Sequence, residues 1–416
     1  MVRKEKLSLD TILLLERKIA LKKITKINYS TSGPSESKNV SVFWDTSVKI
    51  YKTKEGIEYV KTPDLNTWLN DESYFDSQIL FSNERFPNLV VSNKGTLIAT
   101  WGSSKVIAKR STNGGISWGD EIIIAEPGFQ GGGTLVDEVT GNIFVFVEEG
   151  HPISPIQIYI SSDDGQSWKK HDTKISPDEK GHLPSMHMNE HGITLKKGKY
   201  SGRLIRPSRY YGENNSKEQY PNHYSNAIYS DDRGISWKTS SQFPAFGTGE
   251  AALEELSNGI IYYNSRRHYS NDGLNPKMRH VAFSDDGGES WEDLSVSTVL
   301  PDGAQFRDYG LMGGLTRIPI NDLDILLFSN IISSKKENAR TNGYVWISFD
   351  GGKSWPLKKS VDKGSFAYSS MIAGKPGTSS EGKIFLLYES ESGAKLARFN
   401  LKWLLNGVDI STYLKL

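Results

Sequence analysis

The stretch Ser284-Asp285-Asp286-Gly287-Gly288-Glu289-Ser290-Trp291 follows the pattern Ser-x-Asp-x-Gly-x-Ser-Trp, which occurs five times in the chain. An Asp carboxylate that accepts hydrogen bonds from nearby backbone N–H groups, followed by a fixed glycine, predicts a tight turn after a strand. The tryptophan is expected to pack between neighbouring sheets. Successive tryptophans are 50 to 69 residues apart, a period typical of propeller blades. The other copies are Ser111–Trp118, in which Asn113 replaces the aspartate, Ser161–Trp168, Ser230–Trp237 and Ser348–Trp355.

Six short apolar runs are expected to be the second strands of successive blades, and they predict an all-β, six-bladed β-propeller. We assign residues 40–416 to this propeller, and expect a strand between Val40 and Tyr59 to close the ring. Residues 1–39 are expected to form an N-terminal extension, with a short helix near Leu9 to Ile19 and a polar linker. The six runs are Thr96–Thr100, Ile143–Val147, Arg203–Arg206, Ile260–Tyr263, Ile325–Phe328 and Ile384–Leu387.

Composition excludes several classes of function. The chain has 50 Lys and Arg against 49 Asp and Glu, so nothing in its charge indicates a nucleic-acid partner. It has no cysteine, hence no disulfide framework and no thiolate site. The apolar run from Leu7 to Leu15 is interrupted by Asp10, and is too short to span a membrane and a poor signal peptide. We therefore expect no membrane partner, and either a cytoplasmic chain or one whose leader has been removed. The oligomeric state is left open.

Strand directions alternate within a blade, so the ends of second strands and the starts of first strands share one mouth of a propeller. Several charged or hydroxyl-bearing residues fall at these positions, far apart in sequence. Taken singly, each has a simpler interpretation as a solvated or packing residue. Their common placement favours a binding site at this mouth. They include Arg85, His191, Glu250, Arg266, Asp308, Arg340, Tyr368 and Glu389.

Five segments around these residues resemble those of exo-sialidases, or neuraminidases, which also carry these Asp-boxes. The resemblance spans roughly residues 78 to 405. Glu84-Arg85-Phe86-Pro87 resembles the family's Tyr-Arg-Ile-Pro opening, with Phe86 in place of Ile. The other segments are Gly249-Glu250 with Asn264-Ser265-Arg266, Ala339-Arg340, Ala367-Tyr368-Ser369-Ser370 and Leu387-Tyr388-Glu389.

The resemblance implies a retaining exo-glycosidase that acts on sialic acid or a related 2-keto acid sugar, with an acidic glycan as its partner and no cofactor. Tyr368 would be the nucleophile, Glu250 its base, and Glu389 would orient Arg85. A neutral phenol suits a substrate whose own carboxylate would repel a carboxylate nucleophile. That substrate carboxylate would be held by three guanidinium groups: Arg85, Arg266 and Arg340.

One segment departs from the family pattern. Sialidases have an acidic loop, which contains the general acid, after the second strand of blade one. Here Thr100–Val106 is short and has no acidic residue. Three residues at the mouth are therefore candidates for a proton donor or a substrate contact: Glu149, His191 and Asp308. Others are open as well: Glu148, His151 and Glu190.

The segment His182–His191 contains three histidines, but loop spacing fixes no coordination geometry, so no metal site is predicted. A substrate-contact loop is the alternative. Arg206–Tyr211 also suits an acidic or hydroxylated sugar. Two other functions stay open: a glycosidase or lyase of the same fold that acts on another acidic glycan, and a non-catalytic glycan-binding propeller.

Overall fold

The computed structural model describes residues 27–29, 40–42, 48–53, 56–61, 65–69, 71–82, 85–187, 189–214, 216–267, 277–303, 310–320, 322–332 and 340–414. Its contacts divide the chain into two units, Met1–Asp64 and Leu65–Leu416. In the first unit, β1 (Ile27–Tyr29) pairs with β2 (Val40–Val42), and β3 (Val48–Thr53) pairs with β4 (Gly56–Lys61). The predicted helix near Leu9 to Ile19 lies outside the described residues.

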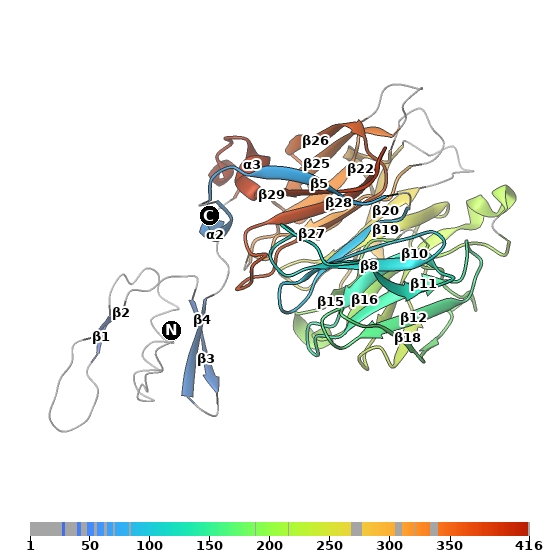
Figure 1. Ribbon diagram of the computed structural model, residues 1–416, viewed down its shortest axis with the longest axis horizontal. Coiled ribbons are helices and arrows are strands. Elements are labelled where there is room, and N and C mark those ends of the chain that lie inside the picture. Colours follow the sequence, from blue (N-terminus) through green and yellow to red (C-terminus); the bar gives the residue numbers. More distant parts are fainter. Residues whose placement is uncertain are drawn as a thin grey trace. The chain divides into compact units, whose positions relative to one another are not determined.

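The second unit contains six sheets, which confirms the predicted six-bladed propeller (Figure 1). All six second strands lie where the apolar runs predicted them, at β7, β11, β16, β20, β24 and β28. Blade one consists of β6 (Asn88–Val91), β7 (Leu97–Trp101), β8 (Val106–Ser111) and β9 (Ile122–Ala125). Blade two consists of β10 (Phe129–Val136), β11 (Ile143–Glu148), β12 (Ile156–Ser161) and β13 (Lys169–His171). Blade three consists of β15 (Ile193–Thr194), β16 (Leu204–Tyr210), β17 (Tyr224–Ser230) and β18 (Ser236–Thr239), and β14 (Lys174–Ile175) pairs in parallel with β18.

Blades four and five are each one sheet of four consecutive strands, and blade six takes three strands from the end of the chain. Blade four consists of β19 (Thr248–Glu255), β20 (Ile261–Arg267), β21 (Met278–Ser284) and β22 (Glu292–Pro301). Blade five consists of β23 (Leu315–Arg317), β24 (Leu326–Ile331), β25 (Thr341–Ser348) and β26 (Leu357–Ser365). The three strands of blade six are β27 (Ser369–Ala373), β28 (Ile384–Ser390) and β29 (Gly393–Phe399). The described helices are α2 (Leu65–Leu69), α3 (Leu401–Leu405) and the 3-10 turns Gly198–Tyr200, Lys217–Asn222 and Ile410–Thr412.

The ring is closed by β5 (Phe75–Phe81), which pairs antiparallel with β29 (Figure 1). The expectation that a strand between Val40 and Tyr59 closes it is wrong: among the described residues, β3 and β4 pair only with each other. Asn400 stabilises this closure. Its Oδ1 accepts a hydrogen bond from the backbone N of Tyr74 at 3.1 Å, next to β5. The same atom caps α3 by accepting from the backbone N of Trp403 at 2.9 Å. Closing a propeller with strands from both ends of the chain leaves few free strand edges.

The Asp-boxes form the predicted turns. Asp286 accepts from Ser284 Oγ at 2.7 Å and from the backbone N of Ser290 at 3.0 Å, and Ser284 Oγ in turn accepts from the N of Gly288 at 2.8 Å. Gly288 has a φ of +86°, and a Cβ there would lie 2.0 Å from a side-chain carbon of Ile205 in the preceding blade. Only glycine meets both constraints. Each box therefore fixes both a turn and the distance between two blades.

The second strands are the core of the fold. Every residue of β7, β11, β20 and β24 is buried, because both faces of each blade pack against a neighbouring blade. The box tryptophans fill the remaining spaces, as with Trp291, whose ring lies 4.4 Å from that of Tyr263 between centroids. This rigid frame leaves the ends of the strands at the mouth free to carry the site.

Candidate active site

Six residues predicted from sequence come to the mouth from four blades. Arg85 precedes β6, Tyr368 precedes β27 and Arg340 precedes β25, whereas the other three lie within strands. Glu250 lies in β19, the first strand of blade four. Arg266 and Glu389 lie near the ends of the second strands β20 and β28.

Arg85 and Glu389 form a two-point ion pair. Arg85 donates from Nε to Glu389 Oε1 at 3.1 Å and from Nη2 to Oε2 at 3.4 Å. The backbone N of Phe86 donates to the same Oε1 at 3.2 Å. The carboxylate thus fixes the guanidinium plane while leaving the side chain of Arg85 48% exposed. The contact is the one that an orienting Glu389 would need, and that role stays a prediction.

Tyr368 lies beside two of the arginines. Its ring centroid is 5.4 Å from Cζ of Arg85 and 4.9 Å from Cζ of Arg340. The tyrosine is 8% exposed, and its backbone oxygen accepts from the N of Glu389 at 2.9 Å. Guanidinium groups over a phenol ring stabilise negative charge that develops on its oxygen.

Arg266 and Glu250 form a second ion pair, which is almost wholly buried, with exposed fractions of 2% and 3%. Burial alone would lower the pKa of Arg266, but the charges of Glu250 and Tyr368 outweigh it and raise that pKa above its ordinary value. The Nε of Arg266 is buried and has no hydrogen-bond partner among the described residues.

The three candidates for a proton donor or substrate contact lie in different settings. Glu149 is exposed and accepts from Gln157. His191 is 2% exposed and its Nδ1 lies 2.6 Å from Oε1 of Glu190. Burial would lower the pKa of His191, but the carboxylate of Glu190 outweighs it and raises that pKa. Asp308 lies outside the described residues.

Glu190 reaches across the propeller axis. Its Oε1 accepts from Ser370 Oγ in blade six at 2.6 Å and from the backbone N of Met371 at 3.3 Å. The loop before blade three therefore contacts blade six directly. These contacts favour a structural role for the pair of Glu190 and His191.

The short loop of blade one is a closed turn. The N of Gly102 donates to the backbone oxygen of Arg85 at 2.8 Å. Gly102 has a φ of +148°, and a Cβ there would lie 1.8 Å from the backbone oxygen of Lys105. The turn fits tightly against the segment that carries Arg85. No acidic side chain reaches the site from this turn.

An aromatic cluster, which we call the aromatic wall, lines the side of the mouth formed by blades one to three. His187 is at its centre, with ring centroids 5.2 Å from Phe129, 5.9 Å from Phe86 and 4.8 Å from His151. Tyr211 completes the wall 5.5 Å from His187. Burial lowers the pKa of His187 well below its ordinary value, and nearby arginines lower it further, so this imidazole is neutral.

Sequence reasoning suggested the loop of His187 as a substrate contact but did not find the wall. Phe129 gave no signal in sequence, because aromatic residues at the start of a strand are common in any β-sheet. In the described part of the chain, no three His, Asp or Glu side chains form a group that could hold a metal ion.

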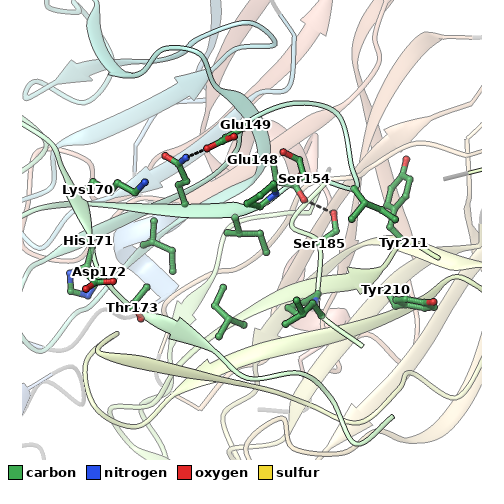
Figure 2. A pocket seen from close by; sticks show the side chains of 18 of the residues that line it. Glu148, Glu149, Ser154, Lys170, His171, Asp172, Thr173, Ser185, Tyr210 and Tyr211 are labelled. Carbon is green, nitrogen blue, oxygen red and sulfur yellow. Dashed lines mark hydrogen bonds between the residues drawn. The ribbon is translucent and has the colours of Figure 1, made fainter. Parts of the chain in front are cut away.

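A cavity of about 990 Å³ lies between blades two and three, next to the wall (Figure 2). The arginines of the mouth do not line it. Tyr211 belongs both to this cavity and to the wall. Figure 2 shows Glu148 close to Ser185, whose Oγ donates to Glu148 Oε1 at 2.7 Å. Burial raises the pKa of Glu148 to about 7.

Comparisons with known proteins agree with this architecture. A model of the BNR repeat-like domain family matches residues 95–384. A sialidase of Micromonospora viridifaciens is 30% identical over 362 residues, which cover 78% of this chain and 52% of that protein. A sialidase of Bacteroides fragilis is 27% identical over 320 residues, which cover 65% of this chain and 54% of that protein. The chain thus spans about half the length of these relatives.

Solved structures share the fold at low sequence identity. A Hadza microbial sialidase aligns with a TM-score of 0.59 and 22% identity, over 77% of this chain and 66% of that one. An intramolecular trans-sialidase from Ruminococcus gnavus aligns with a TM-score of 0.57 and 16% identity, over 79% and 98% respectively. No helix in the described part of the chain is long and apolar enough to cross a membrane.

Proposed function

Because the chain belongs to the sialidase family with BNR repeats, we propose that it is a retaining exo-glycosidase that releases terminal sialic acid, or a related 2-keto acid sugar, from glycans. The observation that carries this proposal is the arrangement around Tyr368. Arg85 and Arg340 lie against its ring, and Arg266 forms an ion pair with Glu250.

The three arginines form the proposed carboxylate site. Three guanidinium groups from separate blades can share one carboxylate through charge-assisted hydrogen bonds. Glu389 keeps Arg85 in one orientation, and Glu250 does the same for Arg266. A lysine at any of the three positions would supply charge without the planar fork.

The chemistry proceeds in two steps. The phenol oxygen of Tyr368 attacks the anomeric carbon, the glycosidic bond breaks, and Glu250 accepts the phenolic proton. Water then attacks the same carbon from the vacated side and loses a proton to the group that protonated the leaving oxygen, the tyrosyl bond breaks, and Glu250 returns its proton to the phenol oxygen. Two inversions give net retention of configuration. A phenol nucleophile avoids the repulsion that a carboxylate would meet from the substrate's own acid group.

The oxygen of the leaving group needs a proton. The turn of blade one has no acidic residue, so the donor must lie elsewhere. Among the described candidates, Glu149 and His151 are exposed near the wall, whereas Glu148, Glu190 and His191 are buried. Water or an exposed residue then supplies this proton. General acid catalysis is worth about 10²- to 10⁴-fold, so natural glycosides are expected to react slowly compared with activated ones.

The test is hydrolysis of 4-methylumbelliferyl N-acetylneuraminate, followed by proton NMR of the first sugar anomer released. The proposal expects turnover with release of the same anomer as in the substrate. Release of the opposite anomer would exclude the covalent tyrosyl step. An anhydro sugar would identify an intramolecular transferase, and binding of the free sugar without turnover of any acidic glycoside would identify a binding protein.

A further inference from the structure

The cavity between blades two and three is lined by none of the residues proposed to bind the substrate carboxylate or to attack the substrate. Its volume of about 990 Å³ lies at the upper end of the roughly 300–1,000 Å³ typical of small-molecule sites, so it has room for a ligand of two rings. Figure 2 shows Tyr210 and Tyr211 at one side of this cavity and Lys170, Asp172 and Thr173 at the other. The cavity thus has an aromatic side and a polar side.

The ring of Tyr210 forms a platform on the aromatic side. The imidazole of His182 stacks on one face of this ring, with centroids 4.0 Å apart and an angle of 6° between the planes. The ring centroid of Tyr224 lies 5.1 Å from that of Tyr210 and 6.1 Å from that of His182, so Tyr224 packs at the edge of the Tyr210 ring. No aromatic ring in the described part of the chain covers the other face of Tyr210, which is partly exposed and lines the cavity.

The platform is supported by hydrogen bonds behind it. Nδ1 of His182 lies 2.6 Å from the hydroxyl of Tyr224, which donates to Oδ2 of Asp178 at 2.5 Å. Oδ1 of Asp178 accepts from the backbone N of His182 at 2.9 Å. These bonds fix His182 against Tyr210, so the ring is preorganised for a ligand.

The cavity is also lined by an amide whose orientation is fixed. Gln157 donates from Nε2 to Oε1 of Glu149, and its Oε1 accepts from the hydroxyl of Tyr159 at 3.1 Å. These two bonds leave one N–H and one lone pair of the amide for other partners. Asp172 adds an exposed carboxylate to the lining. Donors and acceptors thus lie together, which suits hydroxyl groups because each of them both donates and accepts.

Glu148 adds a buried carboxyl group to the lining. Its Oε1 accepts from Ser185 Oγ at 2.7 Å and from the backbone N of Met186 at 3.4 Å. Its Oε2 has no hydrogen-bond partner among the described residues. Buried polar atoms without a partner are uncommon in folded proteins, and a ligand hydroxyl that reaches Oε2 from the cavity would explain this one.

The charges of the lining favour a neutral ligand. Besides the two phenols, the titratable groups that line the cavity are three carboxyl groups, one ammonium group and one imidazole: Glu148, Glu149, Asp172, Lys170 and His171. Two buried arginines act on the carboxyl group of Glu148 through their charges but do not line the cavity: Arg206 and Arg209. A ligand carboxylate would therefore meet more acidic than basic groups and no guanidinium fork.

We propose that this cavity binds a neutral oligosaccharide, with one sugar ring against the face of Tyr210 and hydroxyl groups of the chain on Gln157, Asp172 and Glu148. The face of an aromatic ring is electron-rich and attracts the C–H groups on the face of a pyranose ring. A wholly apolar ligand would leave the amide and the carboxyl groups without partners. The site goes beyond the proposed hydrolysis and does not depend on it.

The test is calorimetric titration with lactose and with its derivative in which C6 of the galactose is oxidised to a carboxylate. We expect the wild type to bind lactose with a Kd of about 1 mM or below, and to bind the acid about fivefold more weakly or worse. Tyr210→Ala should weaken lactose binding about tenfold or more, because it removes the stacking surface, whereas Tyr210→Phe keeps the ring and should stay within about threefold. Tyr413→Ala is the control, since it removes a 36% exposed ring that does not line the cavity, and it should leave the affinity unchanged.

Competition locates the bound sugar. Free N-acetylneuraminate, which the proposed function places at the arginines of the mouth, should not displace lactose, because those arginines do not line the cavity. The proposal is overturned by a wild type that does not bind lactose, by equal or tighter binding of the acid, by displacement of lactose by N-acetylneuraminate, or by undiminished lactose binding in Tyr210→Ala.

The measurements on the wild type need no variant, so a folding defect in Tyr210→Ala does not obscure the result. They also need no hydrolysis. A protein that cleaves no sialoside and binds lactose as expected would refute the proposed function and keep this site, so the two failures are told apart.

Discussion

The ion pair between Glu389 and Arg85 allows a prediction whose size follows from the structure. Glu389→Gln removes the charge and replaces one of two accepting oxygens with an NH₂ group, so one of the bonds at 3.1 and 3.4 Å is lost. A hydrogen bond between charged groups is worth about 1.5–3 kcal/mol, and an exposed ion pair about 0.2–1 kcal/mol. Arg85 is 48% exposed and Glu389 10%, so we expect an intermediate value of about 1–2 kcal/mol.

At about 1.4 kcal/mol per factor of ten, that loss corresponds to roughly a 5- to 30-fold lower kcat/KM for an aryl sialoside. Most of it should be a higher KM, because the proposal has Arg85 hold the substrate carboxylate in the ground state and the transition state alike. Glu391→Gln, an exposed carboxylate two residues away, is the matched control and should change kcat/KM less than twofold. A double-mutant cycle with Arg85→Gln measures the coupling. Independent effects of the two substitutions would refute an orienting role for Glu389.

Three further outcomes are expected. Asp163→Ala should lower the free energy of unfolding by about 1–2 kcal/mol in a denaturant titration, because Asp163 accepts hydrogen bonds from Ser161 Oγ and the backbone N of Ser167. Asp163→Asn should lower it less, since Asn113 accepts the equivalent hydrogen bonds in the first box. Equal losses in the two variants would contradict this account. Burial raises the pKa of Glu254 from 4.5 to about 7, so between these pH values the folded state binds one more proton than the unfolded state. The free energy of unfolding therefore falls as the pH rises through this range. Glu254→Gln should remove up to about 3 kcal/mol of this pH dependence in unfolding titrations from pH 4.5 to 8. Across aryl sialosides of rising phenol pKa, kcat/KM should fall steeply, because blade one supplies no acid; a flat series would indicate an efficient proton donor elsewhere.

The blades could be predicted from sequence because they depend on local patterns. A box such as Ser284–Trp291 carries its own hydrogen-bonding groups and its own glycine, so the turn needs little information from the rest of the chain. Second strands such as β11 are buried on both faces and appear as continuous apolar runs. The closing strand was misplaced because β5 is only partly buried and lacks the continuous apolar run of the second strands.

The site was predicted in part. Arg85, Tyr368 and Glu250 lie in short segments with a recognisable order; the fold brings Arg85 to the ring of Tyr368, and the roles of the three residues stay predictions. The aromatic wall and the cavity beside it depend on contacts between blades that have no local signature. Such contacts follow only from the packing of the folded chain.

The central claim is that the oxygen of Tyr368 attacks the anomeric carbon, and Tyr368→Phe removes only that oxygen. The ring that lies against Arg85 and Arg340 remains, so the arginine site and the fold should be preserved. The measurement is kcat/KM on 4-methylumbelliferyl N-acetylneuraminate, together with the affinity for free sialic acid by calorimetry. We expect a loss of at least about three orders of magnitude in kcat/KM with the affinity nearly unchanged. A Tyr368→Phe protein that keeps more than a tenth of the wild-type activity would contradict the claim.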